Sequence, residues 1–146
     1  MLTELIKNSM NDILITWDDS FLTDIEVIDK QHYAMVNLVN NLYSAFIGNK
    51  ISEISTSEAL DEAEKYIKFH FKTEEDYFEK IDYQGSQIHI GEHKKFINQI
   101  SNFKQAFYSE NQNISLQLMF YLKDWIIEHI LYYDKQYIND LRNHGL

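Results

Sequence analysis

Two pairs of polar residues have spacings that suit metal binding. His89 and His93 lie four residues apart in HIGEH, and His70 and Glu74 lie four apart in HFKTEED. On a helix, residues four apart share one face, with Cβ atoms about 5–6 Å apart. Two imidazoles, or an imidazole and a carboxylate, can then bind one metal ion together. Either motif alone is more typical of a solvated helix face, so metal binding requires that these side chains point inward.

Apolar residues at steps of three and four predict the helices that position these pairs. Four such stripes are present, over residues 25–47, 55–81, 86–109 and 113–140. Short polar connections join them, which favours an all-α, up-down-up-down antiparallel four-helix bundle. Residues 1–24 precede the bundle as an N-terminal arm, with Trp17 and Phe21 as the expected anchors. We interpret residues 1–146 as a single domain.

The composition limits the classes of function. The chain has 146 residues, no cysteine and no proline, and 45% of its residues are hydrophobic, enough for a packed core. Without thiolates, neither a disulfide framework nor a sulfur-ligated metal site can form. The net charge of −10 disfavours nucleic acid and anionic membranes as partners. No apolar run is long enough for a membrane span, and a cytoplasmic protein is therefore expected.

Histidines replace apolar residues at several stripe positions. Five of the six histidines and one glutamate do so: His32, His70, Glu74, His89, His93 and His129. These positions are early in the first and third helices and late in the second and fourth, which is one end of an antiparallel bundle. Imidazoles and a carboxylate buried in one core layer destabilise a fold unless a cation compensates them. Their convergence therefore predicts a metal centre, and His144 falls outside every motif.

The types of ligand favour two iron ions. Five imidazoles and several carboxylate oxygens exceed a four-coordinate zinc site, and the lack of thiolates disfavours copper(I) and iron–sulfur clusters. Two six-coordinate iron ions bridged by carboxylates fit this set, with Glu74 as one bridge and Asp134 as the candidate for the second. The adjacent Glu75 and Asp76 are expected to be ordinary residues on the solvated side.

Asp134 does not follow the helical period. It comes five residues after His129, about 140° around a regular helix, so it lies off the stripe. The stripe itself places Tyr132 inward. For Asp134 to reach the same metals, the fourth helix must be irregular between residues 129 and 138. A π-bulge, which is frequent at functional sites, would provide this.

The combined motifs resemble those of the hemerythrins, most closely the single-domain bacterial type. The family pattern is one His on the first helix, H-x-x-x-E on the second, H-x-x-x-H on the third and H-x-x-x-x-D on the fourth, and all seven positions are present. The resemblance implies one iron ion held by three histidines: His89, His93 and His129. It implies a second iron, with an open position for O2, held by two: His32 and His70. Glu74 and Asp134 would bridge the ions beside a solvent-derived oxo or hydroxo group.

The resemblance also implies a pocket and a function. The family positions that line the O2 pocket are apolar here: Met35, Phe71, Trp125 and Ile126. Tyr137 fits a supporting position. The implied function is reversible O2 binding, for storage, transport or delivery, by a protein that is not an enzyme. Its partners would be O2 and either an O2-consuming enzyme or a sensor partner.

Two other functions stay open at this point. An O2- or NO-sensing module would use the same centre and act through a separate partner. A di-iron oxidase or peroxidase would use a similar bundle, but such enzymes use mostly glutamates and two Glu-x-x-His motifs. This sequence contains no Glu-x-x-His.

Overall fold

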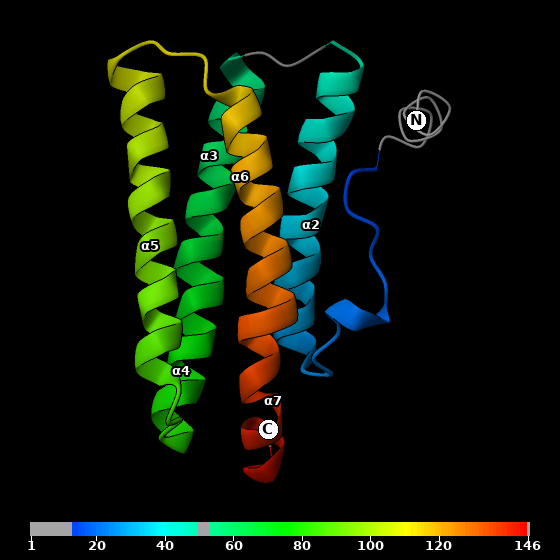
Figure 1. The fold of residues 1–146 in the computed structure, drawn as a ribbon, viewed down its shortest axis with the longest axis vertical. Coiled ribbons are helices and arrows are strands. Elements are labelled where there is room, and N and C mark those ends of the chain that lie inside the picture. Colours follow the sequence, from blue (N-terminus) through cyan, green and yellow to red (C-terminus); the bar gives the residue numbers. More distant parts are fainter. Residues whose placement is uncertain (1–12, 50–52, 146) are drawn as a thin grey trace.

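Four long helical rods stand side by side, and neighbouring rods along the chain run in opposite directions (Figure 1). The computed structural model describes residues 13–49 and 53–145. The first rod is α2 (Glu26–Ile47), and the second consists of α3 (Glu53–Tyr66), η2 (Ile67–Phe71) and α4 (Lys72–Ile81). The third consists of α5 (Ser86–Lys104) and η3 (Gln105–Ser109). The fourth consists of α6 (Ser115–Glu128), η4 (His129–Asp134) and α7 (Lys135–Asn143). Within the described residues there is no strand. The predicted all-α antiparallel four-helix bundle is confirmed.

The chain before α2 packs along the outside of the bundle and includes a single turn of 3-10 helix, η1 (Asp19–Phe21). Phe21 is buried, and the Trp17 ring stacks on it at 5.1 Å and meets the edge of Tyr33 on α2 at 5.2 Å. The two expected anchors therefore contact each other, and Trp17 also contacts the bundle through Tyr33. Residues 1–12 of the predicted arm lie outside the described residues, and the single-domain interpretation of the whole chain stays a prediction.

Two segments of π-helix, η2 and η4, interrupt rods within the described residues, and a third, η3, ends one. η4 covers the stretch from His129 to Asp134, where the sequence predicts an irregular turn, and Asp134 is fully buried. The wider π turn contains one extra residue, so the inward-facing positions after it shift by one residue along the chain. Tyr132, which the regular stripe places inward, is therefore 59% exposed, and the buried series resumes at Asp134 and Tyr137.

A polar layer separates two apolar clusters in the core. The larger cluster contains Met35, Phe71, Phe96 and Ile126, and the smaller one contains Ile28, Phe78 and Tyr137 with their neighbours. On three of the rods the histidines or carboxylates lie between members of the two clusters, as His32 does between Ile28 and Met35, and on α5 they precede Phe96 of the larger cluster. The bundle therefore holds its polar residues at one level, enclosed by packed side chains on both sides.

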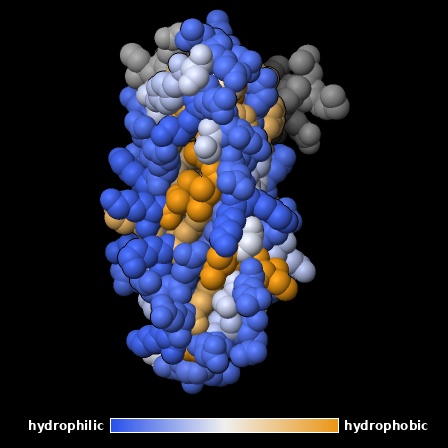
Figure 2. Space-filling view, turned by 90° about the vertical axis from the view of Figure 1, so that its left-hand side faces the viewer, coloured by the Kyte–Doolittle hydropathy of each residue, from blue (hydrophilic) through white to orange (hydrophobic). Residues whose placement is uncertain are grey.

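The outer surface is mainly hydrophilic on the face seen in Figure 2, where most of the apolar side chains lie in a strip along the middle. Among the described residues, the helices are too short or too polar for any of them to cross a membrane.

Candidate metal centre

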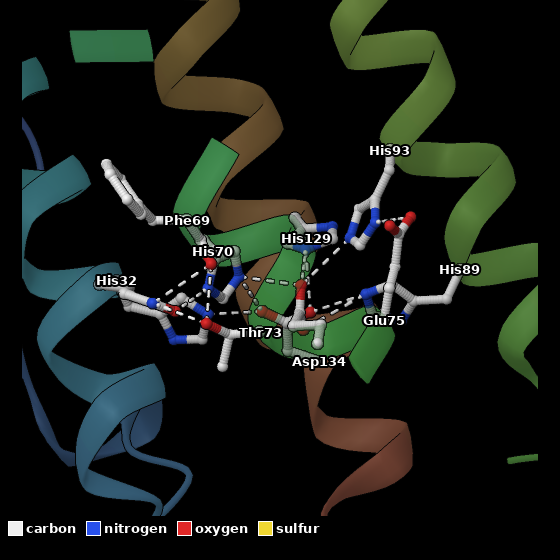
Figure 3. A network of polar contacts seen from close by, with 11 residues as sticks. His32, Phe69, His70, Thr73, Glu75, His89, His93, His129 and Asp134 are labelled. Carbon is white, nitrogen blue, oxygen red and sulfur yellow. Dashed lines mark hydrogen bonds and ion pairs between the residues drawn. The ribbon is translucent and has the colours of Figure 1, made fainter. Parts of the chain in front are cut away.

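All seven ligand candidates from the sequence meet in this polar layer. They come from every rod, and none is more than 2% exposed: His32, His70, Glu74, His89, His93, His129 and Asp134. Figure 3 shows the imidazoles of the separate helices pointing toward one another around the carboxylates. Each of the five histidines directs its Nε2 atom toward a carboxylate oxygen. The structure thus brings together every residue of the predicted ligand set, whereas His144 is exposed near the C-terminus.

Asp134 contacts two different pairs of histidines with its two oxygens. Its Oδ2 atom lies 2.5 Å from Nε2 of His32 and 3.5 Å from Nε2 of His70. Its Oδ1 atom lies 2.9 Å from Nε2 of His129 and 3.1 Å from Nε2 of His89. A carboxylate whose oxygens face separate sets of imidazoles has the geometry required to join two cations.

Glu74 lies at the middle of the cluster. Its Oε1 atom is 2.9 Å from Nε2 of His70, 3.1 Å from that of His93 and 3.2 Å from that of His129. Its Oε2 atom is 3.4 Å from Nε2 of His89. This single carboxylate therefore contacts histidines from three rods.

The π segments place these side chains. In η4, His129 and Ile130 are consecutive and both buried, and Asp134 ends the segment facing the same interior. In η2, His70 and Phe71 are likewise consecutive and both buried, one turn before Glu74. A regular helix turns by about 100° per residue, so consecutive residues rarely share one narrow face. The sequence predicts the irregularity in η4 from the five-residue spacing, but nothing in the ordinary H-x-x-x-E spacing reveals the one in η2.

Several buried polar atoms of the cluster lack a hydrogen bond within the described residues. They include Nε2 of His70 and His89, Oε2 of Glu74 and Oδ1 of Asp134. These atoms lie near opposite charges, but not in hydrogen-bonding geometry. Leaving such atoms unpaired in a core costs free energy, which a metal ion would compensate by accepting their lone pairs. The residues present therefore fit a bound metal.

The ligand atoms fall into two overlapping groups, each with all its atoms within 4.8 Å of one another. One group contains Glu74, His89, His93 and His129, and the other contains His70, Glu74, His129 and Asp134. Both groups share Glu74 and His129. Two cation positions with a common carboxylate are therefore compatible with the arrangement.

Burial and charge together set the protonation of the cluster. Burial favours the neutral form of Glu74 and Asp134, but the surrounding histidines outweigh it and hold the pKa of both carboxyl groups well below its usual range. Burial also opposes charge on the histidines, yet the two carboxylates raise the pKa of His70 to about 9 and that of His89 to about 10. For His32, burial dominates and lowers the pKa. Both carboxylates thus stay ionised and attract cations.

Two residues that the sequence does not single out hold the outer nitrogens of the imidazoles. Nδ1 of His70 donates to the Gln31 side-chain oxygen at 2.7 Å, and Nδ1 of His93 donates to Oε1 of Glu75 at 3.2 Å. The expectation that Glu75 is an ordinary solvated residue is therefore wrong, because its half-buried carboxylate reaches inward to His93. Asp76, by contrast, is exposed and pairs with Lys72 as expected of a surface residue. Such partners fix a metal-binding imidazole's orientation and increase its basicity.

Aromatic rings pack directly on the histidines. Phe71 stacks on His93 with ring centroids 3.8 Å apart, and Trp125 stacks on His129 at 4.2 Å. Both belong, with Met35 and Ile126, to the residues that the family resemblance places around O2. Met35, Phe71 and Ile126 are buried and Trp125 is partly buried, all on one side of the polar layer. Whether they line a ligand pocket stays a prediction.

A family model described as the hemerythrin HHE cation binding domain matches residues 23–141. The chain belongs to the hemerythrin family. All seven ligand candidates lie inside the matched region, and His144 lies outside it. A hemerythrin domain implies non-haem iron, and the buried histidine and carboxylate groups are able to hold metal.

Individual hemerythrins agree with this assignment. The chain is 31% identical over 129 residues to a bacteriohemerythrin of Pseudomonas aeruginosa, covering 88% of this chain and 82% of that protein. It is 31% identical over 132 residues to a bacteriohemerythrin of Clostridium acetobutylicum, covering 86% of this chain and all of that protein. A crystal structure of wild-type hemerythrin superposes with a TM-score of 0.77 at 26% identity, covering 88% of this chain and 98% of that one.

Proposed function

We propose that this chain binds O2 reversibly at a centre of two non-haem iron ions held by the seven buried side chains. The observation that carries the proposal is the position of Asp134, whose two oxygens face different pairs of histidines. With Glu74 shared between the two groups of ligand atoms, the chain offers two bridging carboxylates. The family membership supports iron as the metal.

The ligands divide unequally between the two positions. We assign one iron to three histidines: His89, His93 and His129. We assign the other to His32 and His70, and both ions to the bridging Glu74 and Asp134. The position with two histidines has one protein ligand fewer and can accept an external ligand. When bound, two ferrous ions supply the two electrons that hold O2 reversibly.

The side chains around the ions favour binding over oxidation. Imidazoles outnumber carboxylates in the set, and neutral ligands stabilise highly charged iron less than anionic ones do. The apolar cluster beside the histidines, with Phe71 and Ile126, keeps water and protons away from that side. Gln31 and Glu75 hold the imidazoles in place. We therefore propose a binding protein rather than an oxidase or peroxidase.

Reversible colour change tests this function. Protein loaded with ferrous iron without air should become coloured when O2 is admitted and bleach when O2 is removed under vacuum, over repeated cycles. Glu74→Ala should abolish the reversible change because the shared bridge is lost, and His144→Ala, at an exposed histidine, should leave it intact. Irreversible oxidation of the wild-type protein, or normal binding by the Glu74 variant, would refute the proposal.

A further inference from the structure

A pocket between α2 and the second rod leads from the surface to His70. Its volume is about 240 Å³. Three of its lining residues are buried and form its inner end: Met35, Tyr66 and His70. Exposed or partly exposed residues form its mouth, among them Gln31, Leu38 and Phe69. Figure 3 shows Phe69 and His70 on the side of the centre that faces His32 and α2. The pocket therefore opens onto the position with two histidines.

Tyr66, one of the residues at this inner end, has a buried hydroxyl that lacks a partner among the described residues. Tyr66 is 7% exposed, and its hydroxyl has no hydrogen bond to any residue that the structure describes. A hydroxyl buried unpaired destabilises a core, and phenylalanine would fill nearly the same space without that cost. Packing alone therefore does not explain why this position carries a tyrosine.

The ring of Tyr66 lies directly beside the candidate centre. It stacks on the His70 ring with centroids 4.5 Å apart and an angle of 21° between the planes. The rings of Phe71 and Trp125 lie 5.5 and 6.0 Å away and pack edge-on against it. Tyr66 thus contacts a ligand histidine and also lines the pocket.

The hydroxyl is a permanent hydrogen-bond donor in this position. A phenol has an ordinary pKa of about 10, well above neutral pH. The proton therefore stays on the phenol oxygen. An acceptor for it would have to arrive through the pocket, whose lining admits a ligand of a few atoms.

We propose that the Tyr66 hydroxyl donates a hydrogen bond to a small ligand held on the His32–His70 side of the centre. The ligand class is a molecule or anion of two or three atoms with an acceptor lone pair, such as O2 or azide. This inference rests on the proposed function, because it needs an iron position that is open on this side. It adds a polar residue to a surface that the sequence predicts to be lined by apolar residues alone.

Tyr66→Phe tests the hydrogen bond in the iron-loaded protein. Losing one hydrogen bond should speed O2 dissociation and weaken azide binding to the oxidised protein by about 3- to 10-fold. The matched control is Tyr43→Phe, because Tyr43 is buried to a similar degree in the same apolar cluster, three turns along α2 from His32. The control should bind both ligands as the wild-type protein does. Equal rates and affinities for Tyr66→Phe and wild type would overturn the inference.

Unfolding of the metal-free protein supplies a readout that does not depend on iron. Because the hydroxyl has no protein partner, Tyr66→Phe should unfold in urea at the same or a higher midpoint than the wild type. A lower midpoint would show that the hydroxyl serves the fold and would overturn the inference. Failure of the proposed function and failure of this inference give different results. A wild-type protein that binds neither O2 nor azide refutes the proposed function. Equally strong binding by the wild type and by Tyr66→Phe refutes only the role of Tyr66.

Discussion

Asp134 contributes to the centre through the positions of its two oxygens as well as through its charge. One oxygen faces the pair His32 and His70, and the other faces His89 and His129. Asparagine has the same shape but lacks the charge and one acceptor oxygen, so we expect that it cannot act as the proposed bridge. Two of the imidazoles have a partner on their second nitrogen, and the partners differ: an amide oxygen for His70 and a carboxylate for His93.

The contact between Glu75 and His93 predicts a measurable loss of metal affinity. Glu75→Gln keeps the hydrogen-bond acceptor but removes the negative charge that makes the imidazole more basic. Changes at such partners typically weaken metal binding by about 10- to 100-fold, so we expect a loss at the lower end of this range. Competition with a chelator measures it. Asp76→Asn, next along α4 and exposed, is the control; equal losses in both variants would contradict a specific role for Glu75.

Some residues of the candidate site can be predicted from the sequence and others cannot. The ligand set is predictable because its members replace apolar residues at regular positions on the helices. The roles of Gln31 and Glu75 are not predictable. Gln31 directly precedes one ligand candidate and Glu75 directly follows another, so each points about 100° away from its neighbour around the helix. From that angle they reach an imidazole on another rod, a contact that depends on how the rods pack. Tyr66 is missed for a different reason, since a tyrosine among core aromatics carries no signal of an unpaired hydroxyl.

The π segments are the elements that adapt a bundle to this centre. η2 and η4 each contain a candidate ligand histidine and lie in the two rods that also supply a carboxylate. The five-residue interval from His129 to Asp134 makes η4 predictable, because only a wider turn can bring both residues to one face. η2 is hidden because the interval from His70 to Glu74 is four, as in a regular helix. The number of rods follows from the period of apolar residues, and their alternating direction follows from the short polar connections.

One side chain of α2 binds the backbone of the arm, and its contribution can be tested separately from the centre. Asn40 on α2 accepts hydrogen bonds from the backbone N–H groups of Leu14 and Ile15 and donates to the carbonyl of Ile15, all within 2.9 Å. Asn40→Ala should lower the free energy of unfolding by about 1–3 kcal/mol, measured in urea, with metal content unchanged. Asn41→Ala, at the exposed neighbouring position, should have little effect. A loss of metal with Asn40→Ala would show that the arm supports the centre.

At the scale of the whole molecule, the core is divided by a layer of charged and polar groups. Five histidines and two carboxylates occupy a level where a bundle of this size would otherwise continue its apolar packing. Such a layer stabilises the fold only with its cations present. Metal binding and folding should therefore be coupled.

Removal of metal should lower the stability of the entire bundle. A ligand that binds only the folded state adds about 2.7 kcal/mol at a free concentration of 100 times its Kd. Chelation should therefore lower the thermal midpoint in a single cooperative transition, and restored iron should bring it back. Thermal unfolding followed by circular dichroism, with and without chelator, measures the effect. An unchanged midpoint would mean that the polar layer is stable by itself.

Metal binding should also depend on pH with a definite sign. The carboxylates raise the pKa of His70 to about 9 and that of His89 to about 10, so in metal-free protein both keep a proton at neutral pH. A metal ion needs the lone pair that this proton occupies, so binding must release protons. The apparent affinity should therefore increase with pH from about 6 to 9. Chelator competition across this range, with proton release followed in weak buffer, tests it; affinity that is constant or falls with pH would contradict the prediction.

The uptake of O2 per iron tests the central claim most directly. Wild-type protein loaded with ferrous iron, of measured iron content, is exposed to O2 in a closed cell with an oxygen electrode and then evacuated. We predict two iron ions per chain, one O2 taken up for every two irons, and return of that O2 under vacuum. One metal ion per chain, or O2 that is consumed and never returned, would contradict reversible binding at a two-iron centre.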